Sequence, residues 1–83
     1  MPTVAIVEGV KIEFYYEEHP PPHFHVKHAE YRATVLIDTL EIVKGDLPRS
    51  KYRKVVAWAM TRKAVLDRAW HDCRSDMDPG KIT

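Results

Sequence analysis

Apolar and polar residues alternate along the first half of the chain with the period of two that half-buried β-strands show. The clearest run covers residues 10–16, where Val10, Ile12, Phe14 and Tyr16 point to one side and the residues between them point to the other. Pairs of turn-forming residues separate this run from its neighbours. The pattern predicts strands over residues 3–7, 10–16, 23–28, 31–37 and 40–43.

The period changes to that of a helix after residues 45–48, Gly-Asp-Leu-Pro. Asp46 is a candidate N-cap, and Pro48 suits a first helical turn. Apolar side chains then recur with helical spacing at positions 52, 55, 56, 59, 66, 69, 70 and 73. Because Arg62 and Lys63 interrupt this stripe, the sequence allows either one long bent helix or two consecutive helices.

These elements predict an α+β fold for a single domain over residues 1–83. A four- to five-stranded antiparallel sheet (residues 3–43) is followed by one long or two consecutive C-terminal helices packed on one face (residues 47–75). Residues 76–83 are predicted to form a flexible tail. Since the apolar sheet face and the helical stripe cover each other, the opposite sheet face is left open to solvent or to a partner.

The register of the sheet follows from matching apolar faces, because a slip of one residue would invert every side chain. For the second and third strands, this matching favours Phe14 opposite Val26. Glu13 then lies opposite Lys27, so that opposite charges meet across the ladder. By the same rule, Val26 lies opposite Ala33 of the fourth strand.

Four histidines fall within ten residues, at positions 19, 23, 25 and 28, with three prolines at positions 20–22. Prolines fix φ and lack a backbone donor, so they start the next strand from a stiff point. His23 and His25 then share the open face, with their imidazoles roughly 6.5–7 Å apart along the strand. The predicted register places Glu17 opposite His23 and Tyr15 opposite His25.

Two imidazoles on one face can share a metal ion or divide the roles of general acid and base. The candidate catalytic residues are therefore His23, His25, Tyr15 and Glu17. His23 and His25 are also candidate ligands for zinc or another divalent metal, with His19 and Glu17 as further candidates. The alternative is that these are surface histidines bonded to cross-strand neighbours, and the sequence leaves open whether the protein is an enzyme.

The net charge of +1 hides a strong asymmetry along the chain. Residues 1–48 carry four basic and eight acidic side chains, whereas residues 49–74 carry eight basic and two acidic ones. A basic helical face of this kind can meet the phosphates of RNA or an acidic partner, or it can simply be solvated. The candidate contact residues are Lys27, Arg32, Arg53, Lys54 and Arg62.

The remaining composition narrows the function classes. Cys73 is the one cysteine among the 83 residues, so no internal disulfide forms, and it is predicted to be buried on a helix. No signal peptide and no run of about 20 apolar residues is present, so we predict a cytoplasmic protein without a membrane span. Gly-rich phosphate loops and CxxC, HExxH and GxSxG motifs are absent, which argues against nucleotide hydrolysis and thiol chemistry. For so small a chain, a homodimer is a reasonable expectation.

The segments KIEFYYEEHPPPHFHVKH and EYRATVLIDTLEIVKGDLP, with VVAWA in the helix, resemble domain-of-unknown-function family 4160. The resemblance covers essentially the whole chain, and its most specific element is PPHFHV at residues 21–26. It implies a small cytoplasmic bacterial protein, often encoded beside another small domain in an arrangement similar to toxin–antitoxin pairs. The family pattern has a helical histidine where this chain has Arg62, and the resemblance implies no activity.

Three functions therefore stay open. The first is a component of a toxin–antitoxin-type module that contacts RNA or the translation machinery through the histidine-bearing sheet face. The second is a non-catalytic interaction or regulatory module whose open face docks a small protein encoded nearby. The third is a metal-binding domain that uses the His-x-His strand.

Overall fold

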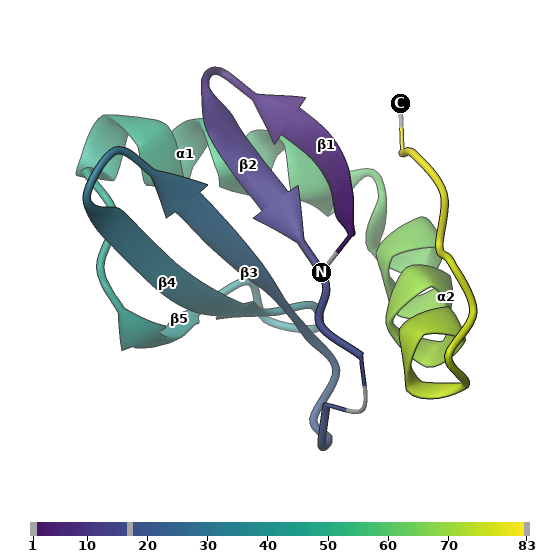
Figure 1. Ribbon diagram of the computed structural model, residues 1–83. Coiled ribbons are helices and arrows are strands. Elements are labelled where there is room, and N and C mark those ends of the chain that lie inside the picture. Colours follow the sequence, from purple (N-terminus) through teal and green to yellow (C-terminus); the bar gives the residue numbers. More distant parts are fainter. Residues whose placement is uncertain (1, 17, 83) are drawn as a thin grey trace.

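The computed structural model describes residues 2–16 and 18–82, and over these residues it confirms the predicted α+β fold (Figure 1). Five antiparallel strands are followed by two helices. They are β1 (Thr3–Val7), β2 (Val10–Glu13), β3 (His23–His28), β4 (Tyr31–Leu36), β5 (Ile42–Gly45), α1 (Arg49–Met60) and α2 (Lys63–Arg74). Each strand pairs with its neighbours in the sequence, in the order β1-β2-β3-β4-β5. Of the two helical alternatives, the structure has two consecutive helices.

The core lies between the sheet and the helices, and it is built from the alternation seen in the sequence. Phe24 and Val26 of β3 and Val35 of β4 are at most 1% exposed. Val55 of α1 and Leu66 of α2 are fully buried on the helical side. In Figure 1, α1 crosses behind the sheet and α2 lies beside the start of β3. The helices therefore cover one sheet face, as predicted.

Two strands, β2 and β5, differ from the predicted ranges. The run predicted over residues 10–16 ends as a strand at Glu13, and Tyr16 beyond it is 42% exposed rather than inward-facing. The last strand covers residues 42–45 instead of 40–43. It ends at Gly45, where a Cβ atom would come within 2.1 Å of the Arg32 carbonyl oxygen. This close approach requires glycine, and the hydrophobic pattern contained no sign of it.

The register between β2 and β3 corrects a prediction. Ile12, rather than Phe14, lies opposite Val26, and Lys11, rather than Glu13, lies opposite Lys27. The predicted pairing was wrong by two residues. A shift of two keeps every side chain on its predicted face, so matching apolar faces could not detect the error. The predicted pairing of Val26 with Ala33 between β3 and β4 is confirmed.

The C-terminal segment returns to the sheet. The backbone N–H of Ile82 donates a hydrogen bond to the Val4 carbonyl oxygen at 2.8 Å, and the Ile82 side chain is buried. Lys81 also donates from Nζ to the Thr3 carbonyl oxygen. The expectation of a flexible tail did not foresee these contacts with β1. No helix in the described ranges has the length and apolar character that crossing a membrane requires.

Candidate functional site

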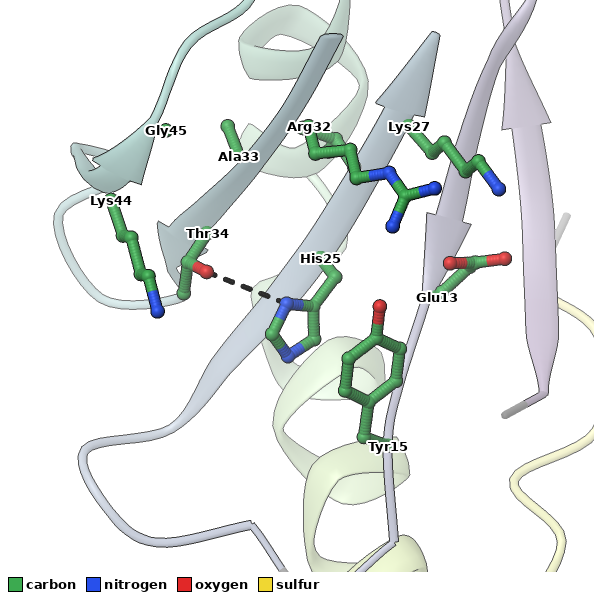
Figure 2. A pocket seen from close by; sticks show the side chains of 10 residues that line it. Glu13, Tyr15, His25, Lys27, Arg32, Ala33, Thr34, Lys44 and Gly45 are labelled. Atoms are coloured by element: carbon green, nitrogen blue, oxygen red, sulfur yellow. Dashed lines mark hydrogen bonds between the residues drawn. The ribbon is translucent and has the colours of Figure 1, made fainter. Parts of the chain in front are cut away.

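The sheet face turned away from the helices, here called the open face, carries its side chains in rows, because paired residues of adjacent strands point to the same side. One row consists of Lys11, Lys27 and Arg32, and we call it the cation row. The next row, two residues along the strands, is made of Glu13, His25, Thr34 and Lys44. Figure 2 shows Lys27, Arg32 and the second row standing in front of the sheet, with the helices behind it.

His25 of the second row also belongs to a cluster of three metal-ligating side chains, here called the His–Glu cluster. Its members are Glu18, His23 and His25. One ligand atom from each lies within 4.8 Å of the other two. Oε1 of Glu18 is 2.7 Å from Nε2 of His25 and 3.6 Å from Nε2 of His23. The side chains are 26%, 18% and 12% exposed for Glu18, His25 and His23, so the cluster is half-buried but reachable from solvent.

The other ring nitrogens of both histidines already have partners. Nδ1 of His23 lies 2.7 Å from the Pro21 carbonyl oxygen. A carbonyl only accepts, so this nitrogen carries the proton, and Nε2 of the neutral ring keeps its lone pair. Nδ1 of His25 lies 3.4 Å from Oγ1 of Thr34, a longer contact. Histidines that bind metals are commonly oriented in this way by a carbonyl or another polar group on the second nitrogen.

Ring packing fixes the two imidazoles further. Tyr15 stacks on His25 with ring centroids 3.9 Å apart and an interplanar angle of 11°. His23 meets His25 edge to face at 5.2 Å, and its other neighbour is Trp70 of α2 at 6.4 Å. His23 thus lies on the same side of β3 as His25, at the end of the strand that Trp70 of α2 approaches. Both rings are held before any ligand arrives, which lowers the entropy cost of binding.

Two hollows join the cation row to the His–Glu cluster. The first, of about 350 Å³, is lined by Lys27 and Arg32 of the cation row, by the second row, which includes Lys44, and by Tyr15 (Figure 2). The second, of about 580 Å³, is lined by the His–Glu cluster and by His19. The two hollows share four lining residues: Tyr15, His25, Thr34 and Lys44. We call this continuous depression the trough.

The structure brings together three of the four candidate catalytic residues, Tyr15, His23 and His25, whereas Glu17 lies outside the described residues. His19 lines the second hollow but does not belong to the His–Glu cluster. Glu18 does, and the sequence reasoning missed it. Its only signal was its position in the EEH segment before the prolines, and strand alternation says nothing about a residue in a loop.

A model of the family described as "Domain of unknown function (DUF4160)" matches residues 9–71. The chain belongs to this family. The match spans the cation row, the trough and the His–Glu cluster, but not β1 or the C-terminal segment. Searches of the curated proteins and of the solved structures find no match. Membership of the DUF4160 family therefore brings no activity with it, and the chemistry must be argued from the residues.

Within this DUF4160 chain, the five basic contact candidates separate into three places. Lys27 and Arg32 lie on the open face. Arg53 and Lys54 are exposed on α1, in the other layer. Arg62 lies between the helices, where Nη1 donates to the Trp58 carbonyl oxygen at 2.8 Å and the guanidinium sits 5.1 Å from the Trp58 ring centroid. Arg62 thus helps to hold the connection between the two helices.

Cys73 lies outside the site, as a buried residue of α2 that is 1% exposed, which confirms the prediction for it. Burial raises the pKa of its thiol above the ordinary value of 9.0, and the nearby carboxylate of Asp72 acts in the same direction. The thiol is therefore protonated at neutral pH. The thiolate is the reactive form, so the raised pKa and the burial of Cys73 both disfavour its reaction as a nucleophile.

Proposed function

We propose that the protein is a metal-binding domain that holds a divalent cation, zinc in the first place, through Glu18, His23 and His25. The observation that carries the proposal is the convergence of two Nε2 atoms and one carboxylate oxygen within 4.8 Å. Among the three functions that the sequence left open, metal binding has the most direct geometric support.

The distances suit zinc. In a tetrahedral site with bonds of about 2.0–2.1 Å, the ligand atoms stand about 3.3 Å from one another. The separations of 3.6 Å and 2.7 Å from Oε1 of Glu18 to His23 and His25 bracket that value. Small movements of the Glu18 side chain, which extends from a loop, would bring both of these distances to that value.

The number of ligands argues for a reactive or ligand-binding role. Structural zinc sites usually have four protein ligands, whereas catalytic sites have three and keep one position for water or substrate. Two histidines and one glutamate are a common catalytic set, and the ion makes a bound water more acidic. Here the fourth position would open toward the trough, since that hollow is lined by all three ligands.

The expectations of a toxin–antitoxin-type module, an RNA or translation target, a partner encoded nearby, a homodimer and a cytoplasmic, bacterial origin stay predictions. What supports the first of these is the family resemblance and not a contact of this chain. A metal site on the open face is compatible with each of them, because it defines chemistry and not the partner.

The test is zinc binding by the untagged full chain after treatment with a chelator. We expect one zinc ion per chain in a calorimetric titration, and a rise in the unfolding temperature with zinc. Glu18→Gln and His25→Ala should each weaken binding by more than the roughly 10–100-fold that loss of an outer partner of a metal ligand costs.

His71→Ala and Glu30→Gln are the matched controls, because they remove the same functional groups from exposed positions outside the His–Glu cluster. Both should bind zinc as the wild type does. A chain that binds no zinc, or variants of both sets that lose it equally, would overturn the proposal.

A further inference from the structure

The cation row has an unusual charge pattern for a sheet. Lys11, Lys27 and Arg32 lie directly opposite one another on β2, β3 and β4. Directly opposed like charges destabilise a sheet, and sequences normally place opposite charges there. None of the three side chains makes a hydrogen bond or an ion pair with a residue in the described ranges 2–16 and 18–82. An anion from outside the chain would remove this repulsion.

Lys27 and Arg32 of the cation row, together with Lys44, line a hollow that could receive such an anion. In Figure 2 the guanidinium of Arg32 extends across β3 toward Glu13 and Tyr15, and Lys44 reaches along Thr34 on the other side. Among the described residues, Glu13 is the one carboxylate that lines this first hollow, whereas Glu18 lines the second. Thr3 donates a hydrogen bond to Oε2 of Glu13 at 3.3 Å. Three positive charges against one negative charge leave an excess that matches a phosphate group.

We propose that the trough binds a phosphate group of a nucleotide or of single-stranded nucleic acid, with Lys27 and Arg32 contacting the phosphate oxygens. This inference names the ligand class for the face that carries the metal site, and in that respect it rests on the proposed function. The planar guanidinium of Arg32 offers paired donors for two phosphate oxygens, and Lys27 adds a point charge.

Two further features favour a nucleotide-type ligand over other anions. Tyr15 and His25 form a stacked aromatic pair at the junction of the two hollows, and nucleobases stack on such side chains. The trough also continues from the cations to the His–Glu cluster, since His25 lines both hollows. A phosphate held by the cation row would therefore lie beside the proposed metal ion, a common arrangement for phosphoryl oxygens.

The experiment measures binding of a fluorescent single-stranded RNA of about ten nucleotides to the full chain at several salt concentrations. The double variant Lys27→Gln/Arg32→Gln should bind about ten-fold more weakly or worse. Its slope of log K against log salt should fall by about two, one for each lost phosphate contact.

The matched control is Arg49→Gln/Arg68→Gln, which removes the same charge from exposed positions of α1 and α2. It should bind with nearly the wild-type affinity and slope. Equal losses in the two double variants would mean that only net charge matters, and no loss in the trough variant would mean that the trough is not used. Either result overturns the inference.

Competition by inorganic phosphate and by adenosine monophosphate identifies the source of the phosphate group. Displacement of the RNA by either small ligand, lost in the trough variant, indicates a small phosphorylated ligand. RNA binding that neither displaces, but that still requires Lys27 and Arg32, indicates the nucleic acid itself. Both outcomes support phosphate recognition by the trough.

Zinc titrations of the same variants separate this inference from the proposed function. If Lys27→Gln/Arg32→Gln keeps its zinc and its RNA affinity, the phosphate inference fails and the metal site stands. If no variant and no wild-type sample binds zinc, while the trough variant still loses RNA, the metal site fails and phosphate recognition stands.

Discussion

The two faces of the sheet differ in which side chains lie opposite one another and in what those side chains do. On the covered face, side chains such as Phe24 and Val35 are fully buried, and their alternation follows the packing of the helices. On the open face, three cations stand directly opposite one another, and two imidazoles share one carboxylate oxygen. The first arrangement stabilises the fold. The second lowers the stability of the sheet by roughly 0.2–1 kcal/mol for each pair of like charges. Because this arrangement does not stabilise the fold, we infer that it serves binding.

Strand β3 contributes to both faces, since Phe24 points to the covered side and Lys27 to the open side. Phe24→Ala should lower the free energy of unfolding by about 3–5 kcal/mol, because it leaves a cavity in a fully buried position. Lys27→Ala should not lower it and should raise it by up to about 1–2 kcal/mol, because the change removes two like-charge pairs. Urea unfolding followed by circular dichroism measures both. Similar losses in the two variants would contradict the division between the faces.

A charge reversal in the cation row should have a smaller effect of the opposite sign. In Lys27→Glu, the new carboxylate faces Lys11 and Arg32, so two repulsive pairs become attractive ones. We expect the free energy of unfolding to rise by roughly 0.5–2 kcal/mol, while binding of the RNA probe is lost.

Lys44→Glu is the control for this reversal, because Lys44 lies opposite Thr34 and not opposite another cation. It should give no comparable gain in stability. If the Lys27→Glu chain is less stable than the wild type, the repulsion within the cation row is not a real cost of the open face.

The smallest expected effect on the free energy of unfolding comes from Cys73, on the covered side of the sheet. The folded state raises the pKa of this thiol, so at alkaline pH the unfolded chain releases the proton while the folded chain still holds it. The stabilisation that the Cys73 thiol contributes is fully present below its ordinary pKa of 9.0. It is lost as the pH rises through the higher pKa that the thiol has in the folded state. Unfolding at a series of pH values should show this decline.

The Cys73→Ala variant should show a flatter dependence of stability on pH above 9.0, even though it is less stable throughout. Desolvation, together with the charge of Asp78, also raises the pKa of Tyr16, so this residue contributes a decline that starts near its ordinary value of 10.0. The Tyr16→Phe variant removes that contribution. A decline that is unchanged in Cys73→Ala would assign the effect to other groups.

The local pattern was enough to predict most of the sheet. Alternation over residues 23–28 and 31–37 placed β3 and β4 and their register, because two long strands joined by a tight turn have few alternative pairings. It failed between β2 and β3, which are joined by a long loop. There the predicted Glu13–Lys27 pair satisfied every local rule, yet the strands pair two residues away from it.

The candidate site likewise contains residues that the sequence predicted and residues that it missed. His23 and His25 could be named from their spacing on one strand, and Tyr15 from its position on the next. Glu18 could not, because it lies in the loop before the prolines, where no periodicity fixes the direction of a side chain. Lys11 was missed because the predicted register gave Lys27 an acidic neighbour.

The sequence by itself determined which residues form strands and helices, and which side chains point toward the core, because hydrophobic burial acts on every residue through a local period. The tertiary structure decided which strands' side chains stand opposite each other and which loop carboxylate meets the two histidines. Those choices depend on the turn geometry and on packing between distant segments. It follows that the cation row and the His–Glu cluster exist only in the folded chain.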